Sequence, residues 1–154
     1  MGERRSSKKP PGVLYNVGYE GRSADQLLDL LELTQVQVLI DVRLNPISRK
    51  PGLSKTKLAA ALAAKGIEYV HEPLLGNPQE NREGFSNGHL AQAKAAYAAR
   101  LTNGSRDAFI RLVERARDER VAMLCMESEP ERCHRQVIVE AVEDEAPDLV
   151  QLPL

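Results

Sequence analysis

Apolar residues along this chain follow two alternating patterns. Short runs rich in Val, Ile and Leu are typical of buried strands, and longer stretches with apolar residues three and four apart are typical of helices. The strand pattern occurs at residues 13–19, 36–42, 67–71, 121–126 and 149–152. The helical pattern occurs after Ser23 and at residues 56–65, 90–101, 107–120 and 130–143.

Local signals support these boundaries. Ser23 is a good N-cap for the first helix, and Gly66 stands where a helix commonly ends. Strands that alternate with helices indicate an α/β fold. We therefore expect a three-layer structure, with a mainly parallel sheet of about five strands and helices on both faces. No change in composition marks a boundary within residues 13–154, so one domain is predicted.

Residues 1–12 read as a basic tail that ends in Pro10-Pro11-Gly12. Such a segment is predicted to be disordered, and a solvated terminus is favoured over a nucleic-acid-binding arm because the charge cluster is small.

Composition narrows the possible functions. The 154 residues carry 21 Lys and Arg against 22 Asp and Glu, a net charge of −1, so no whole-surface attraction to nucleic acid is expected. The longest apolar stretches fall far below the ~20 residues that span a bilayer. No signal peptide is recognisable, and two cysteines make no disulfide framework. A cytoplasmic protein with reduced thiols is expected, without a membrane partner.

Unusual residues gather where the predicted strands end. In open parallel sheets, ligands bind beyond the carboxyl ends of the strands. That rule selects residues 18–21, 41–50, 72–77 and 125–135. A polar segment at residues 77–88 reads as a long loop, and loops of that length are usually functional or mobile.

Asp41 and Arg43 follow the second predicted strand and lie on the same side of it. They predict either a buried ion pair or an anion site in which Asp41 orients Arg43. Ser48, Arg49 and Lys50 add hydrogen-bond donors and positive charge nearby. Anion binding and a merely solvated basic loop remain equal alternatives here.

Residues 125–135 are the densest candidate segment. Ser128 to Glu131 match a capping box, which would place Cys133 and His134 just inside a helix. A thiol there can have a lowered pKa, with His134 or Arg135 adding to the effect. Helical spacing also allows both residues to be core residues, and a structural cysteine is the favoured reading. Glu127 is a candidate general base or an ion-pairing carboxylate.

Two familiar sites do not fit this segment. A Cys-x5-Arg oxyanion loop counted from Cys125 would place Glu131 where arginine is needed. Zinc typically takes four Cys or His ligands from paired short spacings. Cys125, Cys133 and His134 supply three without such spacing, and His71 is a weak fourth candidate, so no metal site is predicted. The cofactor, if any, stays unknown.

These motifs resemble a known family over about residues 13–140. The resemblance lies in Asn16-Val17-Gly18-Tyr19, Asp41-Val42-Arg43 with Pro46 and Ser48-Arg49, Tyr69 with His71 and Pro73, Leu75-Gly76, and Cys125-x-Glu127-x-x-Pro130-x-x-Cys133-His134-Arg135. The sequence is similar to the domain-of-unknown-function 488 family, which implies a small prokaryotic α/β protein and no particular reaction. The chain departs from the family at Tyr19, usually His, and at Asn77, where a second Gly is common.

Two functions compete on this sequence, with an enzyme ranked first. The enzyme would act on a phosphate-bearing or nucleotide-like anion at the carboxyl edge of the sheet. Its catalytic candidates are Asp41, Glu127, Cys133 and His134, and its ligand-binding candidates are Arg43, Ser48, Arg49, Arg135 and Gly18. The alternative is a non-catalytic module that binds an anion or nucleic acid, and a purely structural role is third. The sequence does not predict the oligomeric state.

A geometric expectation underlies the enzyme hypothesis. If the sheet is parallel, Arg43, Glu127 and residues 133–135 should line one cleft, with the 77–88 segment covering it.

Overall fold

The computed structural model describes residues 12–85, 87–127 and 133–154. Most of the predicted tail and the predicted capping box at 128–131 therefore lie outside the described residues. Of the tail range, Gly12 is described, and it is buried against the backbone of Ala116 and Arg117.

A five-stranded, all-parallel sheet forms the centre of the fold and confirms the predicted α/β class. Its strands are β1 (Val13–Gly18), β2 (Val38–Asp41), β3 (Glu68–His71), β4 (Arg120–Cys125) and β5 (Val150–Pro153). The spatial order is β3-β2-β4-β1-β5, so β4 lies between the two strands that come first in the chain. All the strands therefore end at one edge of the sheet.

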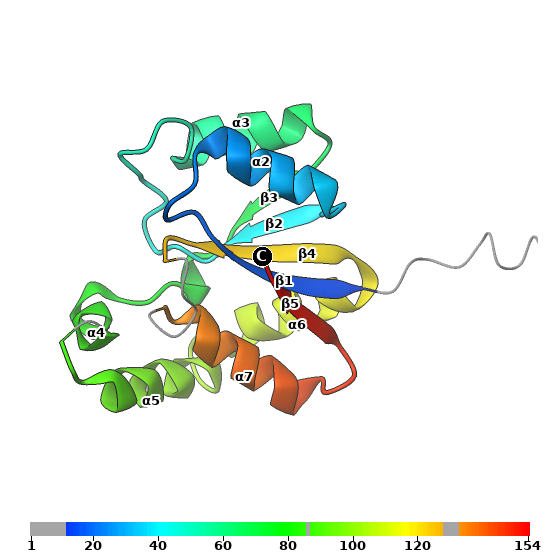
Figure 1. Cartoon of the computed structure of the whole chain (residues 1–154). Coiled ribbons are helices and arrows are strands. Elements are labelled where there is room, and N and C mark those ends of the chain that lie inside the picture. The colour runs from blue at the N-terminus through cyan, green and yellow to red at the C-terminus, as the bar shows by residue number, and fades with distance from the viewer. Residues whose placement is uncertain (1–11, 86, 128–132) are drawn as a thin grey trace, which may run out of the picture.

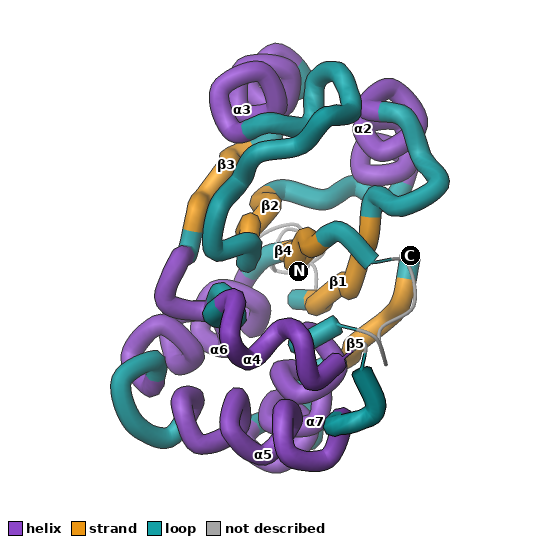
Figure 2. The backbone as a smooth tube through the Cα atoms, turned by 90° about the vertical axis from the view of Figure 1, so that its left-hand side faces the viewer, coloured by secondary structure: helices purple, strands orange, loops and turns teal. Residues whose placement is uncertain are grey.

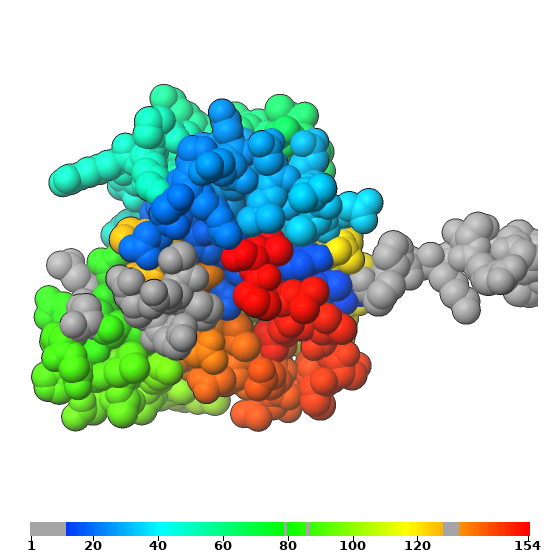
Figure 3. All heavy atoms as spheres, viewed as in Figure 1, coloured from blue at the N-terminus to red at the C-terminus, as the bar shows by residue number. Residues whose placement is uncertain are grey.

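Helices cover both faces of the sheet, as Figures 1 and 2 show. One face carries α2 (Ala24–Leu33) and α3 (Lys55–Ala64). The other carries α4 (Gln79–Arg82), α5 (Leu90–Leu101), α6 (Arg106–Asp118) and α7 (Arg135–Glu145). The space-filling view shows the same division, with blue to cyan residues on one side and green to orange residues on the other (Figure 3). The predicted three-layer arrangement is confirmed.

Alternating side chains of the central strands build two separate cores. In β4, Val121 and Met123 pack with the α5–α7 side, whereas Ala122 and Leu124 pack with the α2–α3 side. A central strand that is buried on both faces reads as a continuous apolar run, which is the pattern seen in the sequence. Cys125 continues this alternation and lies on the α5–α7 side, with only 6% of its surface exposed.

Capping and turn residues act largely as the sequence predicts. The Ser23 hydroxyl accepts a hydrogen bond from the Gln26 amide, and the Gln26 side chain accepts one from the Ser23 amide. This reciprocal pair fixes the start of α2 directly after β1.

Two segments differ from the sequence prediction. The polar 77–88 segment contains α4 and a 3-10 turn, Glu83–Phe85, and the Asn81 side chain donates to Asn77 Oδ1 and to the Ala93 carbonyl. These side-chain bonds organise a segment with few apolar residues, and the hydrophobic pattern does not report them. The last helix begins at Arg135 among the described residues, so His134 is its N-cap residue and Cys133 precedes it.

Among the described residues, no helix is both long and apolar enough to cross a membrane.

Candidate functional site

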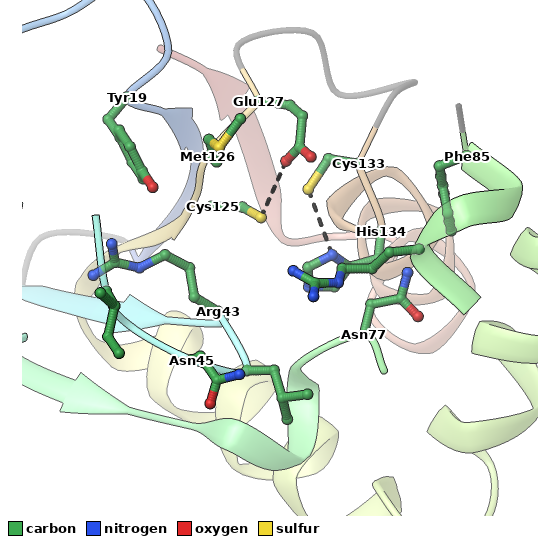
Figure 4. Close-up of a pocket in the computed structure, with 13 residues that line it drawn as sticks. Tyr19, Arg43, Asn45, Asn77, Phe85, Cys125, Met126, Glu127, Cys133 and His134 are labelled. Carbon is green, nitrogen blue, oxygen red and sulfur yellow. Dashed lines mark hydrogen bonds between the residues drawn. The ribbon is translucent and has the colours of Figure 1, made fainter. Parts of the chain in front are cut away.

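A pocket opens at the carboxyl edge of the sheet, with a cavity volume of about 140 Å³. Its walls come from the segments that follow β1, β2 and β4, from the residues before α7, and from the segment that contains α4. The lining residues include Tyr19, Arg43, Asn45, Asn77, Arg82, Phe85, Cys125, Met126, Glu127, Cys133 and His134. In Figure 4, Arg43 and Tyr19 lie across the pocket from Cys133 and His134. The expected convergence is confirmed for Arg43, Glu127, Cys133 and His134, but Arg135, which was expected beside them, does not line the pocket.

Asp41 and Arg43 form the predicted ion pair, and both residues are buried. Arg43 Nε lies 2.8 Å from Asp41 Oδ1, and Arg43 Nη2 lies 2.6 Å from Asp41 Oδ2. The Tyr69 hydroxyl donates to the same Oδ2 at 2.6 Å. Burial acts to lower the pKa of Arg43, but the hydrogen bonds and negative charge of Asp41 outweigh it and raise the pKa above its ordinary value. The guanidinium is therefore permanently charged and fixed in place.

Further contacts aim Arg43 at the pocket. Its Nη1 donates to the Leu53 carbonyl at 2.7 Å, and its Cζ lies 5.4 Å from the centre of the Tyr19 ring. Asp41, with no exposed surface, lies behind Arg43 and does not line the pocket. Asp41 thus acts on the site by holding Arg43.

His134 is oriented by contacts on two sides. Its Nε2 lies 3.2 Å from the Val42 carbonyl oxygen, and its ring packs edge-on against Tyr97 with centroids 5.0 Å apart. Because a carbonyl oxygen can only accept, Nε2 carries the hydrogen in this bond. The other nitrogen, Nδ1, faces Cys133 Sγ at 3.5 Å.

The two cysteine thiols have opposite pKa shifts. Burial acts to raise the pKa of Cys133, but the hydrogen bond from Cys125 and the charges of His134 and Arg135 outweigh it and lower this pKa well below its ordinary value. The hydrogen bond with Cys133, together with burial, raises the pKa of Cys125 well above its ordinary value. Cys133 is therefore the more acidic thiol of the pair.

Glu127 places a carboxylate beside these thiols. Its Oε2 accepts a hydrogen bond from Cys125 Sγ at 3.4 Å. Burial, followed by the negative charge of Cys133, raises the pKa of Glu127. The pocket thus combines a carboxyl group, two thiols and an imidazole at contact distances.

Arg135 is enclosed rather than presented to a ligand, with 1% of its surface exposed. It donates to the Asn16 side-chain oxygen, to the Glu127 carbonyl and, at 3.4 Å, to Cys133 Sγ. These bonds tie the end of β4 and the start of α7 to the middle of β1. Arg135 therefore fixes the relative positions of Glu127 and Cys133.

The remaining sequence candidates stand outside the pocket lining. Ser48 accepts from the Lys50 amide and its own amide donates to Ser54 Oγ, so it shapes the loop. Arg49 is exposed on the same loop. The Gly18 carbonyl accepts from Arg22 Nη1 at 2.8 Å, which ties the end of β1 to the following turn.

Several residues that line the pocket have no functional role predicted from the sequence. Tyr19 stands out in the sequence only as a departure from the usual family residue, and Arg82 and Phe85 lie in the predicted polar loop. The sequence signal for Arg82 and Phe85 is that their loop follows a strand that ends at the same edge of the sheet. The sequence does not show which side chains of the loop face the pocket, because this depends on how α4 packs beside it.

Close packing beneath the pocket gives a stability prediction at Gly76. A Cβ at this position would lie 2.7 Å from Leu44 Cα and 2.9 Å from Leu44 N, which is backbone that cannot move aside. We expect Gly76→Ala to lower the free energy of unfolding by about 1–3 kcal/mol because it overpacks this contact. Chemical denaturation measures the loss. Gly104→Ala is the matched control, since nothing lies within 4 Å of its Cβ; equal effects of both variants would contradict the close approach.

Comparison with known proteins gives one match. The family model described as Domain of unknown function DUF488 matches residues 23–142. No curated protein and no solved structure matches the chain. The matched range contains the pocket residues from β2 to the start of α7.

Proposed function

The chain belongs to the DUF488 family, and on the chemistry of its pocket we propose that it is an enzyme acting on a small phosphate-bearing or nucleotide-like anion. One observation carries this proposal: a fixed guanidinium, a carboxyl group, an acidic thiol and an oriented imidazole line the same cavity. Convergence of such groups in a concave pocket is the usual mark of a reaction centre. They come from Arg43, Glu127, Cys133 and His134.

The size of the cavity limits which part of the ligand enters it. The cavity of about 140 Å³ is small beside the ~300–1,000 Å³ of pockets that hold drug-sized ligands, so it suits a phosphate group and a few attached atoms. The rest of a nucleotide-like ligand would lie toward Phe85, whose ring is half-buried at the pocket. This size favours a small ligand over a nucleic-acid chain as the partner.

Two arginines of the pocket would bind the anion in different ways. Arg43 is already paired with Asp41, so it contributes oriented N–H groups more than net charge. Arg82 is exposed, lines the pocket and makes no ion pair with any other described residue. We therefore assign the net attraction for an anion to Arg82.

The reacting groups have distinct roles in this proposal. Glu127 transfers a proton to or from the ligand. Cys133 and His134 are the electron-pair donors at the floor of the pocket, through Sγ and Nδ1. Asp41 and Arg135 are positioning residues, because each touches a pocket residue and neither lines the cavity. A cytoplasmic location fits the two free thiols at the pocket.

Ligand binding is tested by native mass spectrometry of the full chain against a panel of nucleotides and phosphate esters. We expect wild-type protein to retain one panel member per chain, and Arg82→Ala to retain at least tenfold less. Arg117→Ala is the control. This exposed arginine near the end of α6 pairs with Asp148 and does not line the pocket. Retention of no panel member, or equal retention by both variants, would overturn the proposed ligand class.

A further inference from the structure

Cys125, Cys133 and His134 bring three metal-binding atoms together at the pocket. Their two Sγ atoms and a ring nitrogen all lie within 4.8 Å of one another. We propose that these three residues bind one divalent transition-metal ion of the zinc class. The inference deepens the proposed function, because it names a metal ion as the group that accepts electron pairs from Cys133 and His134. It rests on the proposed function for the role of the ion in the reaction, but not for the binding of the ion.

The spacing of the donor atoms fits tetrahedral coordination. Zinc–sulfur bonds of about 2.3 Å and zinc–nitrogen bonds of about 2.0–2.1 Å at tetrahedral angles require S···N separations of roughly 3.5 Å and S···S separations of roughly 3.8 Å. Cys133 Sγ and His134 Nδ1 lie 3.5 Å apart. The longest separation in the set is 4.8 Å at most, so side-chain adjustments of about 1 Å close the site.

The orientation of His134 favours a metal ligand. Its Nε2 hydrogen bonds to the Val42 carbonyl, so Nδ1, which faces Cys133 Sγ, is the nitrogen that can bind a metal ion when it carries no proton. Metal-binding histidines commonly donate their other N–H to a backbone carbonyl or carboxylate in this way. The Tyr97 ring packs against the imidazole and limits its rotation.

The surroundings of the thiols also suit a metal ion. Cys125, Cys133 and His134 are 6%, 2% and 5% exposed, yet all three line the pocket. Arg135 Nε donates to Cys133 Sγ at 3.4 Å, a contact that stabilises a thiolate ligand from outside the coordination sphere. Two sulfurs and one imidazole form a donor set that selects zinc-like ions over magnesium or calcium.

Three protein ligands leave a fourth position on the ion. Catalytic zinc sites have this composition, with a water or a substrate oxygen in the remaining position, whereas structural sites have four protein ligands. Here the fourth position faces a cavity lined by Glu127, whose Oε2 lies 3.4 Å from Cys125 Sγ. A bound ion would supply Lewis acidity where the ligand enters, and Glu127 would act on protons beside it.

The sequence predicts no metal at these three residues because they lack a paired short spacing. Cys125 ends β4, while Cys133 and His134 are neighbours in the chain directly before α7. His71, the weak fourth candidate, lies outside the cluster, and its Nε2 bonds to the Arg43 carbonyl at 2.8 Å.

Cobalt(II) is a direct probe, because thiolate–cobalt coordination gives charge-transfer absorption in the near ultraviolet and tetrahedral sites give intense visible bands. We expect the full chain, treated with a chelator and reductant and then dialysed, to bind one cobalt ion with both signals, and one zinc ion to displace it. His134→Gln should weaken zinc binding by at least about 100-fold, beyond the 10–100-fold range for loss of an outer-shell partner. His89→Gln, which removes an exposed imidazole outside the cluster, should bind like the wild type.

Absence of the thiolate–cobalt band in the wild-type protein would overturn the inference, and so would unchanged affinity in His134→Gln. Should His134→Gln fail to fold, the wild-type protein provides a second test, in which one equivalent of zinc should protect both thiols from an alkylating reagent. Thiols that react equally with and without zinc would contradict the site. These measurements use no organic ligand. A protein that binds the metal but no panel anion therefore refutes the proposed function alone. One that turns over a ligand but shows no thiolate–cobalt band refutes the metal site alone.

Discussion

Arg43→Ala is expected to lower the free energy of unfolding by about 3–5 kcal/mol, the range for removing one partner of a buried ion pair. The Asp41 carboxylate has no exposed surface, and Arg43 supplies three of the four hydrogen bonds that it accepts from described residues, two from the guanidinium and one from the backbone amide. The alanine variant keeps the amide and the Tyr69 hydroxyl but loses the opposite charge. Urea denaturation at neutral pH measures the loss.

Two further variants make this prediction specific. Arg49→Ala removes an exposed arginine from the same loop and should change stability by less than about 0.5 kcal/mol. Combining Asp41→Asn with Arg43→Met removes both charges and should restore part of the loss, since no unpaired carboxylate then remains. Similar small losses for Arg43→Ala and Arg49→Ala would show that the Asp41–Arg43 pair is exposed in solution.

Glu127→Gln is expected to lower turnover of the ligand identified by mass spectrometry by about 10²–10⁴-fold, the usual contribution of a positioned acid or base. Glutamine keeps the size of the side chain and an oxygen that can accept from Cys125, but it cannot carry the transferred proton. Ligand affinity should stay within a few-fold of the wild type. Steady-state kinetics and a binding titration on the same preparation measure both quantities.

Glu114→Gln provides the matched control, because this exposed residue of α6 lies outside the pocket. Its turnover should equal that of the wild type. Equal turnover in Glu127→Gln would exclude Glu127 as the proton-transfer group. Ligand binding without turnover in the wild-type protein would point instead to the non-catalytic anion-binding module.

Strands and helices are largely predictable from this sequence because several apolar runs have a glycine, a proline or a capping residue beside them. The continuous run at β4 indicates burial on both faces, and the mixed sequences of β3 and β5 suit sheet edges. The order of the strands is not contained in these local patterns. Placement of β4 between β1 and β2 depends on which helices pack on which face.

The site was predictable to the extent that strand ends define it. Asp41 with Arg43, and Glu127 with Cys133 and His134, follow from the rule that parallel strands end at one edge. The direction of each side chain was not predictable in the same way. Arg135 turns inward because Asn16, far away in the sequence, offers it an oxygen within the fold.

The position of β4 also constrains how the molecule can assemble during synthesis. β1 and β2 form no ladder with each other, because each pairs with β4. β4 begins at Arg120, so a nascent chain that ends before this residue can pair β2 with β3 but has no strand that joins them to β1. The same late segment carries Cys125 and Glu127, and Cys133 and His134 follow it. The strand that joins the two halves of the sheet therefore also completes the pocket, and a chain released early from the ribosome would lack both.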